Sequence, residues 1–174
     1  LAIEGEAGTG KTLLTYDIAK HYDFHEKKHV HIIHCGLLNK GHRRLQEVGF
    51  RIDSIYTINW DDLYEADIII IDEAQRMHPE DVHRLLAYAE VNAINLLFSY
   101  DPTQYIGRDE AMFKNEETFA QRTTYERPLK LTGRIRSNRE IISFVKKLFN
   151  RKHPGPIETY DNIEFQYFTT IEDA

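Results

Sequence analysis

Eight residues near the start of the chain have the types and spacing of a phosphate-binding loop. They read Gly5-Glu6-Ala7-Gly8-Thr9-Gly10-Lys11-Thr12 and match the pattern G-x-x-x-x-G-K-[ST] in full. Glycines let backbone N–H groups converge on a phosphate, and the first turn of a following helix adds further donors. The Lys11 ammonium can reach β- and γ-phosphates, and the Thr12 hydroxyl can bind Mg²⁺. The motif predicts a nucleoside triphosphate site formed by Gly5, Glu6, Ala7, Gly8, Thr9, Gly10, Lys11 and Thr12.

Two adjacent carboxylates follow a run of four isoleucines. Ile68–Ile71 are succeeded by Asp72 and Glu73, in the stretch Asp-Glu-Ala-Gln-Arg. A carboxylate at the end of a buried strand can hold the Mg²⁺ shell, and a second one beside it can polarise the attacking water. We therefore assign Asp72, with Thr12, to Mg²⁺ binding and Glu73 to the role of catalytic base. A solvated turn is the alternative, and the upstream loop and the aliphatic strand disfavour it.

An amide and two arginines could supply the remaining chemistry. Gln104 ends the stretch Tyr-Asp-Pro-Thr-Gln, and its amide can bond both a γ-phosphate oxygen and a nearby water, although Asp-Pro also opens ordinary turns. In the stretch Leu-Thr-Gly-Arg-Ile-Arg-Ser-Asn of residues 131–138, a guanidinium could stabilise charge on the transferred phosphoryl group. Arg134 and Arg136 compete for this role, and surface display is the alternative for either.

The segments around these clusters predict an α/β fold with a parallel sheet covered by helices on both faces. Four consecutive isoleucines cannot alternate between core and solvent, so both faces of their strand must be covered. The strand–helix rhythm then places ligands at the carboxyl ends of the strands. The predicted strands are 1–3, 29–35, 68–71, 95–100 and 129–131, with a short strand and turn in 52–60, and the predicted helices are 13–21, 37–48, 61–66, 79–91 and 138–149. Residues 104–127 are interpreted as a surface excursion with a helical piece near 110–121.

Length and composition limit the classes of protein. At 174 residues the chain can form one domain plus part of a second, so we expect an ATPase lobe in 1–150 and a linker with the start of a second lobe in 151–174. Because the chain begins at Leu1 inside a strand, we expect it to be a fragment. The chain has no apolar run of about 20 residues. The single Cys35 fits a reducing compartment, and we therefore expect a cytoplasmic protein that does not enter the membrane.

Charge leaves the question of nucleic-acid binding open. The net charge of −6 argues against a surface that binds nucleic acid over most of its area. Basic residues form three clusters: Lys40, His42, Arg43 and Arg44; Arg134, Arg136 and Arg139; and Lys146, Lys147, Arg151 and Lys152. Such clusters are as consistent with solvated helix faces as with a local nucleic-acid track.

A metal site in segment 29–35 is disfavoured. His29, His31 and Cys35 share one face of the predicted strand, but no second Cys or His pair has the spacing of metal ligands. Packed, hydrogen-bonded strand residues are the preferred interpretation.

Four stretches, taken in their order along the chain, resemble the ATPase motifs of superfamily one DNA/RNA helicases. They are the glycine loop of residues 5–12, Asp-Glu-Ala-Gln-Arg, Asp-Pro-Thr-Gln and Leu-Thr-Gly-Arg-Ile-Arg-Ser-Asn. They are similar to the helicase-like domains of bacterial proteins allied to the Schlafen helicase group, over Ile3 to about Phe149. Asp-Glu-Ala-Gln-Arg is the most specific of them. The resemblance implies a RecA-like P-loop NTPase fold, ATP or ADP with Mg²⁺, and single-stranded DNA or RNA as partner. It also implies that Arg136, rather than Arg134, contacts the γ-phosphate from the second lobe.

The chain departs from this family pattern in its nucleic-acid and late motifs. Cys35–Lys40 lacks the usual Pro-Thr-rich motif that contacts the single strand, and Tyr100 stands where a glycine is usual. The late motifs of a second RecA-like lobe are missing, so we expect the 174 residues alone to hydrolyse ATP slowly. The leading interpretation is the motor lobe of a helicase or translocase, and the alternative is a regulatory ATPase switch that acts on a protein partner without unwinding. A small-molecule kinase is disfavoured, because residues 103–127 do not resemble an arginine-rich lid.

Overall fold

The computed structural model describes residues 1–104, 115, 118–119 and 128–132, which belong to one compact unit. Its strands are β1 Ala2–Gly5, β2 Val30–His34, β3 Arg51–Ser54, β4 Ile68–Asp72, β5 Asn95–Tyr100 and β6 Leu129–Leu131. Its α-helices are α1 Lys11–Lys20, α2 Lys40–Glu47 and α3 Pro79–Val91. A π-helical turn, η1 His21–His25, continues α1, and the 3-10 turns are η2 Trp60–Leu63 and η3 Ala74–Arg76.

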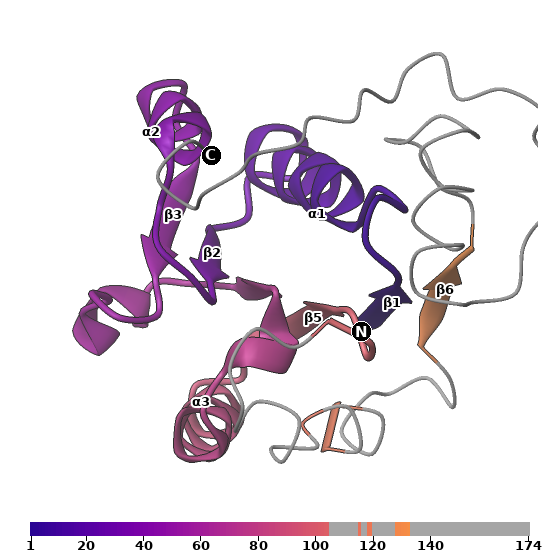
Figure 1. The fold of residues 1–174 in the computed structure, drawn as a ribbon. Helices are drawn as coiled ribbons and strands as arrows, with labels where there is room; N and C mark the ends of the chain where they lie inside the picture. The colour runs from indigo at the N-terminus through magenta and orange to yellow at the C-terminus, as the bar shows by residue number, and fades with distance from the viewer. Residues whose placement is uncertain (105–114, 116–117, 120–127, 133–174) are drawn as a thin grey trace, which may run out of the picture. The chain divides into compact units, whose positions relative to one another are not determined.

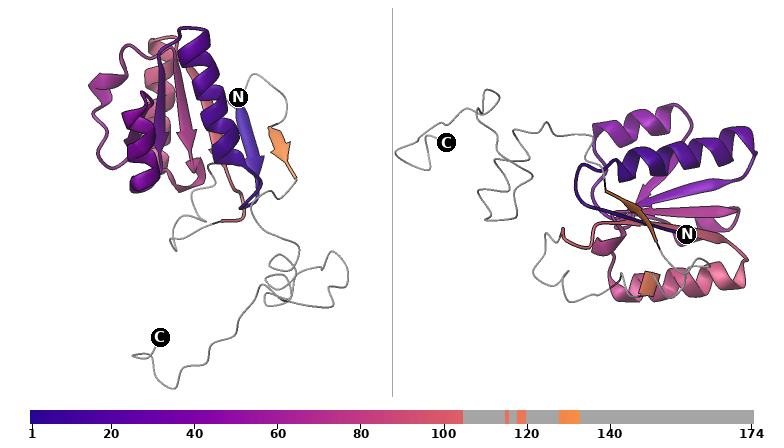
Figure 2. Two further views of the ribbon diagram at one scale, coloured as in Figure 1. Left: turned by 90° about the horizontal axis from the view of Figure 1, so that it is seen from above. Right: turned by 90° about the vertical axis from the view of Figure 1, so that its right-hand side faces the viewer.

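The strands form one parallel sheet in the order β3-β2-β4-β5-β1-β6. The helices α1 and α2 cover one face, and α3 covers the other (Figure 1; Figure 2, right). The carboxyl ends of β1, β4 and β5 therefore lie along one edge, because parallel neighbours run in the same direction. The predicted parallel sheet with helices on both faces is confirmed.

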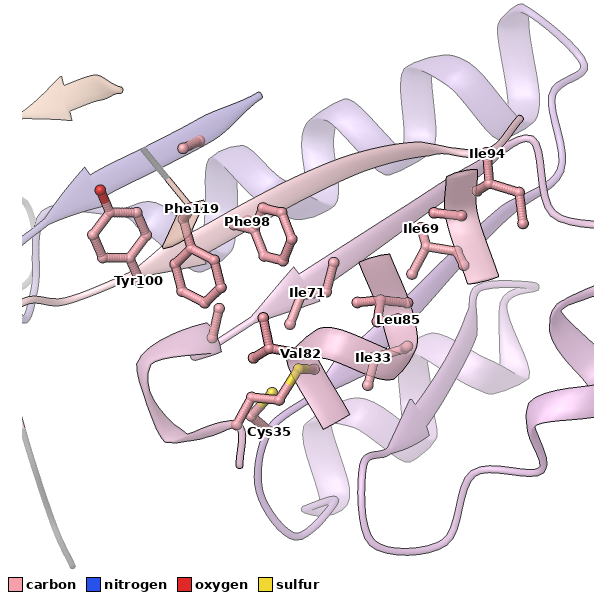
Figure 3. Packing of buried hydrophobic residues seen from close by; sticks show 14 of the residues in the cluster. Ile33, Cys35, Ile69, Ile71, Val82, Leu85, Ile94, Phe98, Tyr100 and Phe119 are labelled. Atoms are coloured by element: carbon pink, nitrogen blue, oxygen red, sulfur yellow. The ribbon is translucent and has the colours of Figure 1, made fainter. Parts of the chain in front are cut away.

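The isoleucines of β4 pack into two separate hydrophobic clusters, one on each face of the sheet. Ile69 and Ile71 pack in the cluster on the α3 side (Figure 3), whereas Ile70 packs with Ala19 of α1 on the opposite side. All three isoleucines are fully buried. Burying a side chain of this size is worth about 1.5–3 kcal/mol, so this strand anchors both layers, as its unbroken aliphatic run predicts.

Three helical segments differ from the sequence prediction. The helix expected over 37–48 begins only at Lys40, because the Asn39 side chain caps it and accepts bonds from Gly41 N and His42 N. The helix expected over 61–66 is only the turn η2. The helix expected over 13–21 is α1, which begins at Lys11 and is followed by the π-turn η1, in which Glu26 N donates to the His21 carbonyl.

The segment interpreted as a surface excursion contains two buried residues. Phe119 is fully buried, stacks on Phe98 at 4.3 Å between ring centroids, and lies 5.5 Å from the Tyr100 ring (Figure 3). The buried Asn115 side chain donates to the Met77 carbonyl at 2.6 Å. The surface interpretation is therefore wrong at these two positions, because the polar residues around them mask their contribution to the α3-side core.

Other expectations fall outside the described residues. These are the helix at 138–149, the linker near 152–156 and the domain boundary at 150, which stays a prediction. Within the described ranges, no helix is long and apolar enough to cross a membrane.

Candidate nucleotide-binding and catalytic site

The phosphate-binding loop joins the end of β1 to the start of α1. Gly8 and Gly10 have φ angles of 81° and 90°, in the left-handed region that glycine adopts without steric cost. Gly10 caps α1 without a side-chain bond, so the first N–H groups of the helix have no side-chain cap. A Cβ on Gly5 would lie 2.5 Å from Thr9 Oγ1, which itself donates to the Glu6 carbonyl at 2.8 Å. The glycines are therefore required by the shape of the loop itself.

The Lys11 ammonium is held at the carboxyl edge of the sheet. Its Nζ donates to the Gly5 carbonyl at 2.8 Å and to the Glu6 carbonyl at 3.2 Å. Asp101 Oδ2 lies 3.8 Å away, and both side chains are buried. Bonds between charged partners are stronger than bonds to neutral carbonyls, so an anionic phosphate oxygen can replace the carbonyl contacts. Glu6 and Ala7 are exposed at the tip of the loop, and Thr12 is partly buried in the first turn of α1.

Asp72 presents an unsatisfied carboxylate at the end of β4. It is 1% exposed, and among the described residues neither of its oxygens has a hydrogen-bond partner. Burial raises the pKa of the Tyr16 hydroxyl and of the Cys35 thiol, and the negative charge of Asp72 raises both further. A buried carboxylate without partners is costly, and Mg²⁺ prefers oxygen ligands. The site therefore fits the predicted cation.

The rest of the donor set also suits magnesium. Within the described ranges, no group of three or more His, Cys, Asp or Glu side chains is arranged to hold a metal ion. Mg²⁺ does not need such a group, because it is usually bound by one or two carboxylates together with substrate phosphates and water. Asp72 and the Thr12 hydroxyl are the protein groups that would hold it.

Glu73 is fixed by a residue that the sequence interpretation left without a role. Gln75 Nε2 donates to Glu73 Oε2 at 2.8 Å, and Gln75 Oε1 accepts the Asp101 backbone N–H at 3.1 Å. Gln75 is buried, its bond to Asp101 is buried and its bond to Glu73 is partly buried, so Gln75 bridges the ends of β4 and β5. Its position two residues after Glu73, inside the most specific motif, was the signal that could have identified it.

The end of β5 supplies Asp101, whose role was also missed. Asp101 Oδ1 accepts from the backbone N–H and the hydroxyl of Thr103, at 2.9 and 2.8 Å, which leaves Oδ2 on the side of Lys11. The same turn carries Gln104, whose side chain is exposed. Its contact with a γ-phosphate stays a prediction. Arg134 and Arg136 lie outside the described residues.

Sheet register brings these groups together. Asp72 on β4 is paired with Ser99 on β5, and Ser99 is paired with Ile3 on β1. Ile3, Ser99 and Asp72 thus lie side by side across the sheet. Beyond them along their strands come the phosphate-binding loop after β1, Asp101 after β5 and Glu73 after β4. Lys11, the candidate phosphate-binding residue, Asp72, the candidate Mg²⁺ ligand, and Glu73, the candidate base, therefore lie at one edge, which is the arrangement that phosphoryl transfer to water requires.

Comparison with known proteins bears on the family and the fold of the chain. The family model described as Schlafen group 3, DNA/RNA helicase domain, matches residues 1–174. Pif1 helicase from Candida albicans has a similar structure, with 18% identity, a TM-score of 0.52 and coverage of 84% of this chain and 39% of that one. Flagellar accessory protein FlaH from Methanocaldococcus jannaschii has 15% identity, a TM-score of 0.45 and 66% coverage of both chains.

These structural likenesses concern the fold. The chain spans less than two thirds of either solved chain. At 18% identity, the likeness to Pif1 identifies a RecA-like P-loop ATPase fold. No curated protein matches the chain.

Proposed function

The chain belongs to the Schlafen group 3 DNA/RNA helicase domain family, and on that premise we propose that it is the ATP-binding and ATP-hydrolysing motor lobe of a superfamily one helicase or translocase. One observation supports this proposal most directly. The buried Lys11 ammonium and the buried, unsatisfied Asp72 carboxylate lie at the same edge of the sheet, beside the glycine loop. This pair can bind phosphate oxygens and the cation that accompanies them.

Binding of ATP uses the loop and the two elements beside it. Backbone N–H groups of Gly8–Thr12 donate to the phosphate oxygens, and Lys11 exchanges its carbonyl bonds for β- and γ-phosphate oxygens. When bound, Mg²⁺ would neutralise phosphate charge that develops during transfer. Thr12 and Asp72 are the residues that would hold it, and the buried position of Asp72 keeps competing water from its oxygens.

Hydrolysis transfers the γ-phosphoryl group to water. The water oxygen forms a bond to γ-phosphorus, the bond from γ-phosphorus to the bridging oxygen of ADP breaks, and the water proton passes to Glu73. Gln75 orients the Glu73 carboxylate through its 2.8 Å bond. We propose that Gln104 orients the water and that Arg136 stabilises the charge on the transferred group.

The proposed partner is single-stranded DNA or RNA. Helix α2 starts after β2, at the same carboxyl edge as the nucleotide site, and its Lys40, Arg43 and Arg44 are exposed. These side chains can bind backbone phosphates, whereas the net charge of −6 disfavours a wider contact surface. A regulatory ATPase that acts on a protein partner is the alternative that the nucleic-acid experiment below excludes or supports.

The nucleotide site is tested by comparing Lys11→Ala with Glu73→Gln. Lys11→Ala should weaken Mg·ADP binding roughly tenfold or more, since it removes a charge-assisted bond to phosphate. Glu73→Gln should bind with unchanged affinity while ATP turnover in the intact protein falls by roughly 10²–10⁴-fold. Calorimetric titration and steady-state phosphate release measure the two effects. Lys20→Ala, an exposed lysine of the same helix, is the matched control, and equal affinity of Lys11→Ala and wild type would refute the site.

The nucleic-acid partner is tested by charge reversal on α2. Arg43→Glu/Arg44→Glu should weaken single-strand binding and flatten its salt dependence, since each lost phosphate contact removes a slope of about 0.7. Lys20→Glu/Lys27→Glu makes the same change in net charge outside α2 and should leave the slope unchanged. If single-stranded DNA or RNA stimulates the ATPase activity of the wild type but not of Arg43→Glu/Arg44→Glu, the result supports a helicase or translocase. If nucleic acid does not change the ATPase rate of the wild type, the result favours the regulatory ATPase.

A further inference from the structure

Two histidines lie between the magnesium-ligand candidate Asp72 and the start of α2. His34 is the last residue of β2 and is paired in register with Asp72 on β4. Its Nδ1 lies 3.5 Å from Asp72 Oδ2, and its ring is 4.4 Å from the ring of His42 at an interplanar angle of 47°. The two rings therefore form a continuous link from the carboxylate to the basic helix.

His42 is held firmly from two sides. It is the third residue of α2, it is buried, and its Nδ1 accepts the backbone N–H of Asn39 at 3.1 Å. The Asn39 side chain in turn accepts the His42 N–H, which completes a capping box. The Tyr16 ring, from α1, lies 6.5 Å from the His42 ring between centroids, at an interplanar angle of 61°. His42 therefore gives the His34 ring a fixed surface against which to pack.

His34 and Asp72 can supply the donor and the acceptor of one hydrogen bond. Among the described residues, His34 Nδ1 and both Asp72 oxygens are buried without a hydrogen-bond partner. A His34 ring that carries its proton on Nδ1 offers a donor to that carboxylate, and a small movement converts the 3.5 Å approach into a hydrogen bond. Hydrogen bonds of this kind to a metal-binding carboxylate fix its orientation and strengthen metal binding.

We propose that His34 is a positioning residue for Asp72 and that His42 holds the His34 ring in place. This proposal rests on the proposed nucleotide function. It follows that Mg²⁺ binding and the seating of α2 share one pair of rings, because His42 also completes the cap of that helix. His42 then takes part in two separate contacts, one with the His34 ring and one in the cap of α2.

The first experiment separates the donor of His34 from its ring. The 174-residue chain is titrated with Mg²⁺ in the presence of a fluorescent ADP analogue, and the half-saturating Mg²⁺ concentration is measured. His34→Phe keeps a ring for stacking but loses the donor, so this concentration should rise roughly tenfold or more. His34→Asn keeps an amide N–H near the Nδ1 position and should stay within about threefold of wild type. ADP affinity in EDTA should not change in either variant.

The second experiment separates the packing of the two rings from capping. His42→Ala removes both, so it should raise the Mg²⁺ requirement and speed hydrogen exchange in α2. Asn39→Ala removes the side-chain cap but leaves the two rings in contact, so exchange in α2 should rise while the Mg²⁺ requirement stays at the wild-type value. In the double variant His34→Phe/His42→Ala, the Mg²⁺ requirement should not exceed that of the more affected single variant, because the two rings act as a unit.

The outcomes distinguish the two proposals. A wild-type Mg²⁺ requirement in His34→Phe overturns the positioning role, and if that variant does not fold, a wild-type requirement in His42→Ala does so. If the wild-type chain binds no nucleotide at any Mg²⁺ concentration, the proposed function is wrong and the positioning role falls with it.

Discussion

Glu73 occupies a backbone conformation that residues with a side chain rarely adopt. Its φ and ψ are 58° and 39°, in the left-handed region, where a non-glycine residue costs about 1–2 kcal/mol. The conformation is retained between the buried Asp72 and the turn η3, with the Glu73 carboxylate bonded to Gln75. Strain of this kind concentrates at functional sites, which agrees with the role of catalytic base proposed for this residue.

We predict that Glu73→Gly is more stable than Glu73→Ala. Both variants lose the carboxylate, but only glycine adopts the left-handed conformation freely, so its free energy of unfolding should be higher by about 1 kcal/mol. Urea denaturation measures the difference. At the exposed position His83 in the middle of α3, the order should reverse, because alanine favours a helix by about 1 kcal/mol over glycine. The same order at both positions would argue against strain at Glu73.

Gly5 is predicted to tolerate no side chain. A Cβ there would lie 2.5 Å from Thr9 Oγ1 and 3.1 Å from the Leu131 carbonyl oxygen of the neighbouring strand. Gly5→Ala should therefore lower the free energy of unfolding by about 1–3 kcal/mol and weaken nucleotide binding. The double variant Gly5→Ala/Thr9→Ala should recover part of the loss. Thermal unfolding and calorimetric titration test this, and wild-type values for Gly5→Ala would show that the loop adapts.

At the scale of the element, α2 is held by the capping box at its start, by the packed Leu45 and by Gln46, whose Nε2 donates to the Ile52 carbonyl at 2.6 Å. It has only eight residues, and isolated helices of that length are marginal in water. Leu45 packs against the core on the α1 side, while Asn39 and His42 form the capping box. Because His42 belongs to the capping box and is buried, its protonation state should affect the stability of the helix.

We predict that α2 loses stability as the pH falls below about 6.5. Burial, and then the neighbouring His34, lower the pKa of His42 below its usual 6.5, while the charge of Asp72 opposes the shift. Protons then bind the unfolded chain more readily than the native one, so the contribution is full above pH 6.5 and is lost as the pH falls towards the lowered native pKa. Hydrogen exchange of α2 amides from pH 8 to 5 measures it. His42→Asn keeps a capping side chain without this titration, and pH curves parallel to wild type would contradict the prediction.

At the scale of the whole molecule, the α3-side core recruits residues that are distant in sequence. Phe119 stacks on Phe98 and lies against Tyr100, in the strand that leads directly to Asp101 (Figure 3). Asn115 reaches the Met77 carbonyl, just after η3. The segment that carries Asn115 and Phe119 therefore supports the two elements that position Gln75 and Asp101.

Phe119→Ala should accordingly destabilise the protein by about 3–5 kcal/mol, the usual cost of removing a fully buried aromatic ring. Phe119→Leu keeps much of the volume and should cost clearly less. Urea denaturation gives both values. A loss below about 0.5 kcal/mol for Phe119→Ala would be the behaviour of a surface residue and would contradict the packing.

Local pattern determined a large part of the fold. The helix Pro79–Val91 and the strand Asn95–Tyr100 have the predicted bounds, because proline at the first helical turn and an aliphatic run bounded by polar residues are local signals. The glycine loop and the four consecutive isoleucines are likewise recognised from residues that are adjacent in the sequence. From these alone follow a parallel sheet and the edge at which its candidate site lies.

Only the tertiary structure decided which side chains meet at that edge. The approach of Lys11 to Asp101, the Gln75 bridge and the His34–Asp72 contact each join residues from different elements. Such contacts depend on strand order and register, which spacing along one segment does not specify. Phe119 was misjudged for the same reason, since polar neighbours determine the local pattern whereas a distant ring at Phe98 determines its burial. Periodicity reports which face of an element is buried, but the partner on that face is set by the packing of the whole chain.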